Sequence, residues 1–89
     1  MELTRISQTA RFRAQVDDVT IEASMVKEEN NNRIEGGNIT SKNGEWLGNF
    51  YANDQQTNFS FNTADREERA ELIAVTEDFI EELRKEDAE

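Results

Sequence analysis

Apolar side chains recur with helical spacing over residues 64–85, a segment that reads ADREERAELIAVTEDFIEELRK and contains neither Gly nor Pro. The recurring positions are Leu72, Ile73, Thr76, Phe79, Ile80 and Leu83. Their i, i+3, i+4, i+7 spacing is typical of a helix with one buried face. Asn62 or Thr63 can cap its start, and the acidic first turn and basic last turn both suit the helix dipole. The pattern predicts one long C-terminal helix.

Two segments near the N-terminus, residues 6–16 and 19–25, alternate apolar and polar residues with a period of two, which is typical of half-buried strands. If Asp17-Asp18 forms a two-residue turn between them, all their apolar residues fall on one face. Arg13 then faces Glu22 across the strands, as an opposite-charge pair. Asp-Asp is a weaker turn signal than Asp-Gly, so a longer loop is the alternative.

Asn43-Gly44 predicts a second hairpin, because both residues tolerate positive φ. Pairing outward from this turn sets Gly37 opposite Phe50. Ile34 then has the wrong parity for the apolar face, and Gly36-Gly37 is where a β-bulge could correct it.

After a polar loop at residues 53–56, a further strand over residues 57–61 sets Phe61 opposite Gly48. An aromatic ring thus faces a glycine twice, and each ring can cover the backbone that the glycine leaves bare.

These elements predict an α+β fold: a five-stranded antiparallel β-meander (two hairpins plus a fifth strand) with one long C-terminal α-helix packed on one sheet face. A single domain covers residues 1–89, with disorder expected at 1–4 and 86–89. Residues 27–32 are expected to form a loop, which could carry the second hairpin to another edge of the sheet. The expected core is Phe12, Ala14, Val16, Ile21, Ala23, Ile39, Trp46, Phe50, Phe59, Phe61 and the helical stripe.

Acidic residues outnumber basic ones by 20 to 10, for a net charge of −10. Residues 62–89 hold 11 acids and four bases, a net of −7, which leaves −3 for residues 1–61. Such a surface repels nucleic acid and anionic lipid and favours basic partners. No segment approaches the roughly 20 apolar residues of a membrane span, and no signal-peptide pattern is present. We therefore expect a cytoplasmic protein that binds neither membranes nor nucleic acid directly.

The chain has no His and no Cys, which removes the commonest general base and the commonest transition-metal ligands. The lysines are expected at a loop, a turn and a helix end, and the helical carboxylates face solvent. A calcium loop at residues 28–32 and a phosphate-binding loop at Gly36-Gly37 both lack the spacing of known motifs. We expect no catalytic activity, no cofactor and no metal.

The helix face opposite Thr76 is predicted to carry a row of acids. These acids are Glu67, Glu71, Asp78 and Glu81, with Glu77 and Glu82 beside them. Like charges at i, i+4 destabilise a helix, and only two pairs, Asp65–Arg69 and Glu81–Lys85, offset them. From Glu67 to Glu82 the row extends about 22 Å, which is long enough to imitate several duplex phosphates. The alternative is a solvated face that serves only solubility.

Leu47 and Tyr51 are predicted on the sheet face away from the helix, where Val26 and Ile34 could join them. Such an apolar patch often marks an oligomer or partner contact, although scattered surface hydrophobes are also ordinary. A sheet edge that pairs with its copy is a related route to a homodimer.

Two functions fit these features. The first is a small acidic binding module that docks its helix face on a basic protein, for example a nucleic-acid-binding protein, as an inhibitor or nucleic-acid mimic. Small acidic inhibitors of nucleases and other DNA-binding proteins are similar in size and charge, without a shared motif. The second is a structural or assembly protein that forms a homo-oligomer through the exposed sheet face or an edge.

Overall fold

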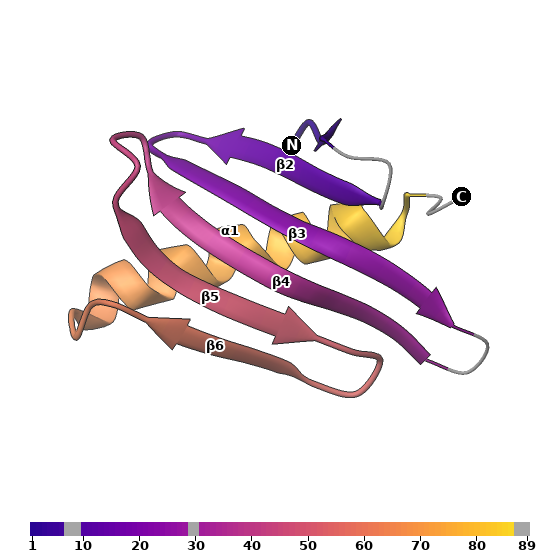
Figure 1. The fold of residues 1–89 in the computed structure, drawn as a ribbon. Helices are drawn as coiled ribbons and strands as arrows, with labels where there is room; N and C mark the ends of the chain where they lie inside the picture. The colour runs from indigo at the N-terminus through magenta and orange to yellow at the C-terminus, as the bar shows by residue number, and fades with distance from the viewer. Residues whose placement is uncertain (7–9, 29–30, 87–89) are drawn as a thin grey trace.

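The computed structural model describes residues 1–6, 10–28 and 31–86, in which an antiparallel sheet packs against one α-helix (Figure 1). The elements are β1 (Thr4–Arg5), β2 (Arg11–Val16), β3 (Val19–Glu28), β4 (Asn31–Ser41), β5 (Trp46–Ala52), β6 (Thr57–Phe61) and α1 (Arg66–Arg84). The strands lie in the sheet in sequence order. The predicted α+β class and meander order are confirmed, but the described sheet has six strands and not five.

The additional strand, β1, arises because the strand predicted over residues 6–16 is broken. Ala10 has a φ of 56°, in the left-handed region, so the extended chain cannot continue through it. The N–H of Ile6 donates to the carbonyl of Arg11 at 2.8 Å, and β1 pairs antiparallel with β2. Ala10 still reaches the core, so the apolar alternation gave no sign of the break.

The predicted register of the first hairpin is confirmed, with Ala14 opposite Ile21 and Arg13 opposite Glu22. Asp17, with a φ of 52°, allows the tight turn between β2 and β3. The Arg13 Nε lies 3.6 Å from a carboxylate oxygen of Glu22, as the cross-strand pair requires.

The next two strands are longer than predicted, because Lys27 pairs with Asn32 and Glu28 with Asn31. The loop expected over residues 27–32 is therefore wrong at these four positions. Residues 29–30 lie outside the described part of the chain, as do residues 87–89 of the tail predicted to be disordered at 86–89.

A β-bulge at Gly36 restores the parity of β4, at the glycine pair where the sequence allowed one. Ile34 pairs with Ala52 while Gly37 pairs with Phe50, so β4 has one extra residue between the two pairs. Gly36 accommodates it with a φ of 65°. Ile34 is thereby turned into the core, where it is 3 % exposed.

A second bulge, in β5, was not predicted. Ile39 pairs with Gly48, but Thr40 pairs with Trp46, which leaves Leu47 as the extra residue. The bulge turns Trp46 away from the helix, where it is 42 % exposed, and directs Leu47 against the core. The predicted core position of Trp46 is wrong, because the bulge reverses the parity of the start of β5.

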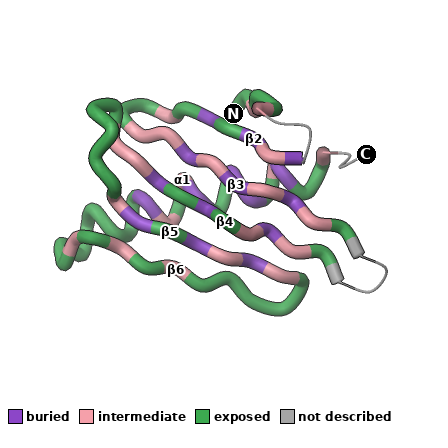
Figure 2. The backbone as a smooth tube through the Cα atoms, viewed as in Figure 1, coloured by how far each residue is buried: buried purple, intermediate pink, exposed green. Residues whose placement is uncertain are grey.

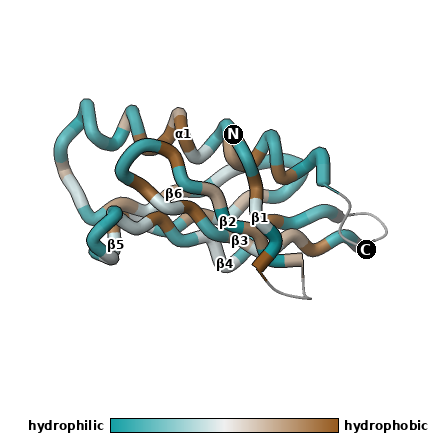
Figure 3. Tube along the Cα trace, turned by 90° about the horizontal axis from the view of Figure 1, so that it is seen from above, coloured by the Kyte–Doolittle hydropathy of each residue, from teal (hydrophilic) through white to brown (hydrophobic). Residues whose placement is uncertain are grey.

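The single helix crosses one face of the sheet obliquely, so sheet and helix form two layers (Figures 1 and 3). Its N-cap is Asp65, whose Oδ1 accepts the N–H of Glu68 at 2.9 Å; the predicted Asn62 or Thr63 cap is wrong. The ring of Phe79 meets Phe50 edge-on, with centroids 6.1 Å apart. Buried and exposed positions alternate along the strands (Figure 2). The buried helical residues are Leu72, Thr76, Phe79, Ile80 and Leu83.

The glycine–aromatic pairs predict a steric penalty at Gly48. A Cβ there would lie 2.5 Å from the carbonyl oxygen of Ser60 and 2.8 Å from Cδ1 of Phe61. We expect Gly48→Ala to lower the free energy of unfolding by about 2–3 kcal/mol, measured by urea denaturation. Gly44→Ala is the control, because Gly44 has a φ of 84° but open space around it, and should cost only about 1 kcal/mol. Equal losses in the two variants would contradict this packing.

The hydroxyl of Thr76 is fully buried and has no hydrogen-bond partner in the described structure. Because a buried unsatisfied polar group is costly, Thr76→Val should raise the free energy of unfolding by about 1 kcal/mol. In a domain of this size, that raises Tm by about 4–8 °C. Thr76→Ser keeps the hydroxyl and removes the methyl, so it should lower Tm. A Val variant less stable than wild type would show that the hydroxyl is satisfied in solution.

Candidate functional site

The two broad faces of the molecule differ in charge. One face is formed by α1. Between the first and last turns of this helix, most of the charged residues are acidic. The other, here called the helix-free face, is the side of the sheet away from α1. On it, Arg11 and Arg13 both lie within 4 Å of Glu22, and Arg33 pairs with Glu35, so its charges are largely balanced. The excess negative charge is therefore concentrated on the helix side.

The predicted acids of the helix lie where the periodicity places them. Glu67, Glu71, Asp78 and Glu81, here called the acidic row, are all exposed, whereas Glu82 is half-buried. At 1.5 Å per residue, the row extends about 21 Å along the helix axis. Glu77, beside the row, is exposed as well.

Charge compensation along the acidic row is weaker than the sequence predicts. Asp65, expected to pair with Arg69, instead caps the helix. The Lys85 Nζ, expected near Glu81, lies 3.4 Å from Glu82 Oε1. No ion pair with a described residue involves any of the four row carboxylates. Neither predicted compensating pair forms in the described structure, so no described base offsets the row at close range.

Two grooves flank the acidic row. The larger, of about 710 Å³, lies between α1 and the start of β6, and its lining includes Thr57, Ala74 and Arg84. The smaller, of about 470 Å³, lies on the other side of the helix, against Gln15 and Val16 of β2. Asp78 and Glu81 line both grooves. A long basic side chain inserted along either flank would therefore meet these carboxylates.

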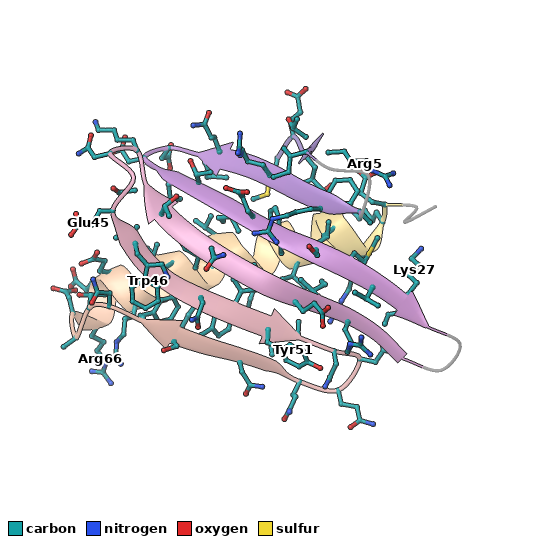
Figure 4. The ribbon with its side chains drawn as sticks, viewed as in Figure 1. Arg5, Lys27, Glu45, Trp46, Tyr51 and Arg66 are labelled. Carbon is teal, nitrogen blue, oxygen red and sulfur yellow. The ribbon has the colours of Figure 1, made fainter. Side chains whose placement is uncertain are left out.

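The second predicted site, on the sheet face, is not formed as expected. Leu47 packs against the core and Ile34 is buried in it, so neither joins Tyr51 on the helix-free face. Trp46 lies there instead, pointing away from α1 as Tyr51 does (Figure 4). Polar Asn49 separates them along β5. The expected apolar patch of Leu47 and Tyr51 is therefore wrong, and Trp46 is the exposed residue that the sequence reasoning missed.

A shallow, uncharged hollow of about 390 Å³ occupies the helix-free face beside the Gly36 bulge. Its lining consists of Gly36, Gly37, Asn38, Asn49, Phe50, Tyr51, Asn58, Phe59 and Ser60. The side chains of three asparagines, a serine and a tyrosine offer hydrogen bonds without charge. Their shared face follows from the predicted registers, but nothing in the sequence indicated a hollow.

No group of three or more Asp or Glu side chains in the described residues is arranged to hold a metal ion. Within the same residues, no helix is long and apolar enough to cross a membrane. The chain matches no protein-family model, no curated protein and no solved structure. The functional proposal below rests on the fold and its surface chemistry.

Leu47 packs against the core while Trp46 lies on the helix-free face, which is the reverse of what the sequence predicts. Truncating Leu47 should therefore destabilise the protein more than truncating Trp46. Leu47→Ala removes a side chain packed against the core and should cost about 2 kcal/mol of unfolding free energy. Trp46→Ala removes a larger side chain that is 42 % exposed and lies outside the core, and should cost below about 1 kcal/mol. Chemical denaturation, followed by far-UV circular dichroism, measures both. A larger loss for Trp46→Ala would show that β5 lacks the bulge.

Proposed function

We propose that this protein is a non-catalytic binding module that docks the acidic row of α1 on a basic protein. The observation that supports the proposal is the row itself, in which four exposed carboxylates, none of them in an ion pair with a described residue, extend about 21 Å along one helix. A helix that is pinned to the sheet by its buried stripe presents these charges in a fixed arrangement. Such preorganisation lowers the entropy cost of binding.

Electrostatics explains how the row favours a partner. Carboxylates at i, i+4, such as Glu67 and Glu71, repel one another and slightly destabilise the helix. Lys or Arg side chains of a partner, inserted into the flanking grooves, would lie against Asp78 and Glu81 and offset the charge of that part of the row. The net charge of −10 also steers a basic protein to the surface at long range.

A nucleic-acid-binding protein is the partner class that the spacing favours. Within the row, Glu67 and Glu71 are four residues apart, which is about 6 Å along the helix axis and close to the rise of two phosphate steps of about 3.4 Å each on one DNA strand. A groove that binds phosphates can therefore accept the row in place of a duplex. On this proposal the protein acts as an inhibitor or nucleic-acid mimic, and it binds no nucleic acid itself.

The alternative of a homo-oligomer through the sheet face loses its main support. That interface required Leu47 beside Tyr51, and Leu47 packs against the core. Uncharged polar side chains of Asn49, Asn58 and Ser60 surround Tyr51 and interrupt the apolar surface around it. The acidic row is the better candidate.

Matched charge reversals test the proposal. Glu71→Lys with Asp78→Lys places two positive charges in the row, whereas Glu2→Lys with Glu45→Lys makes the same change in net charge at exposed positions outside α1. Partners are captured from host lysate on each immobilised protein over a salt series. The row variant should weaken capture by roughly tenfold or more, and the control should not.

The partner captured by the wild type should be released by rising salt and by competing duplex DNA. Equal capture by both double variants at physiological salt would refute the role of the row. If salt releases the partner but duplex DNA does not, the partner is basic but the protein does not act as a nucleic-acid mimic.

A further inference from the structure

β6 forms one edge of the described sheet, and its outer backbone is open. The N–H of Asn62 donates to the Leu47 carbonyl, and the Gln56 carbonyl accepts the N–H of Asn53. Even-numbered residues of this segment therefore direct their backbone groups to β5. The odd-numbered residues Thr57, Phe59 and Phe61 direct theirs to the free edge.

This edge lacks the features by which soluble proteins prevent strand pairing. Residues 55–64 contain no Asp, Glu, Lys, Arg or Pro, in a chain that is 34 % charged. The pairing of β5 with β6 has no bulge that would twist the edge away. Charges, prolines and bulges are the usual protections of exposed edges. The opposite edge, β1, is only two residues long.

The aromatic rings of β6 are incompletely covered. Phe59 and Phe61 lie on the helix side of the sheet and stack, with centroids 5.7 Å apart and planes at 15°. The backbone of α1 approaches β2 and β3 most closely, and a groove separates the helix from the start of β6. Both phenylalanines consequently remain half-exposed beside the open backbone.

We propose that β6 pairs antiparallel with β6 of a second copy of this chain, with Phe59 opposite its own counterpart. This register pairs every outward-facing residue of β6, because Thr57 then lies opposite Phe61 of the other copy. A shift of one residue would set outward-facing residues opposite inward-facing ones, and a shift of two would leave one outward-facing residue of each copy without a partner in β6. Aromatic–aromatic and aromatic–β-branched neighbours are favourable cross-strand pairs.

Charge favours a second copy as the occupant of this edge. Two chains of net charge −10 repel each other, and an uncharged edge allows backbone contact with the least repulsion. The two-fold axis of antiparallel pairing is perpendicular to the sheet, so both helices lie on the same face. The dimer therefore presents two acidic rows on one side. The pairing itself does not depend on the function proposed for the row.

Salt dependence separates dimerisation from partner binding. Salt screens the repulsion between copies, so dimerisation should strengthen as salt rises, whereas binding through the acidic row should weaken. Sedimentation equilibrium of the purified chain should show a shift from 10.3 kDa towards twice that mass with rising concentration and salt. A chain that stays monomeric at all concentrations would overturn the proposal. That result would hold even if the edge binds a peptide of another protein.

Cysteine cross-linking tests the register, since the native chain has no Cys. In the proposed dimer, Asn58 lies opposite Ser60 of the other copy in a non-hydrogen-bonded pair, with Cα atoms about 4.5 Å apart. A mixture of Asn58→Cys and Ser60→Cys chains should oxidise to a covalent dimer. Each variant alone should not, because like positions are about 7–8 Å apart. A covalent dimer formed mainly by either variant alone would overturn this register.

A matched pair of charged variants tests the edge. Asn58→Glu with Ser60→Glu sets introduced carboxylates opposite each other across the dimer and should weaken dimerisation at least tenfold. Asn38→Glu with Asn49→Glu adds the same charge to the helix-free face, on β4 and β5, and should leave dimerisation within a few-fold of wild type. Circular dichroism confirms that both variants fold. Equal weakening of the two would place the contact elsewhere.

Discussion

A single helix covers a single face of the sheet, so every strand must place its apolar residues on that face. Side chains alternate with a strict period of two, and an error of one residue exposes the apolar set of a strand. The Gly36 bulge corrects the parity of β4 and brings Ile34 under the helix. The Leu47 bulge makes a second change in β5 and moves Trp46 to the opposite face. The first insertion thus adds Ile34 to the core, and the second packs Leu47 against the core while Trp46 becomes exposed.

The same arrangement separates the charges of the molecule. The apolar stripe of α1 must face the sheet, so the acids between its members are directed to solvent, where the described structure pairs none of the acidic row with a base. Residues 46–64, which form β5 and β6, contain only one charged residue, Asp54. The β5–β6 edge of the sheet is therefore nearly neutral, whereas the helix is strongly negative. The two proposed contacts, acidic row and β6 edge, use these two regions separately.

Much of the fold was predictable, because the signals that determine it are local. The register around Asp17-Asp18, the bulge at Gly36 and the stripe of α1 each follow from turn chemistry or from periodicity within a few residues. The acidic row was predictable for the same reason, since helical spacing alone decides which acids share a face. The ion pairs of α1 were not predictable, because a long side chain such as that of Lys85 can reach several neighbours at similar cost.

The sequence by itself determined the order of the elements, the apolar face of nearly every strand and the exposed side of α1. Only the tertiary structure decided the break at Ala10, the bulge at Leu47 and the resulting exposure of Trp46. The physical reason is that an extra residue in a strand is selected by pairing with neighbouring strands and by packing against the helix. Those energies come from residues distant in sequence, so the local Trp46-Leu47-Gly48 pattern contains no sign of them.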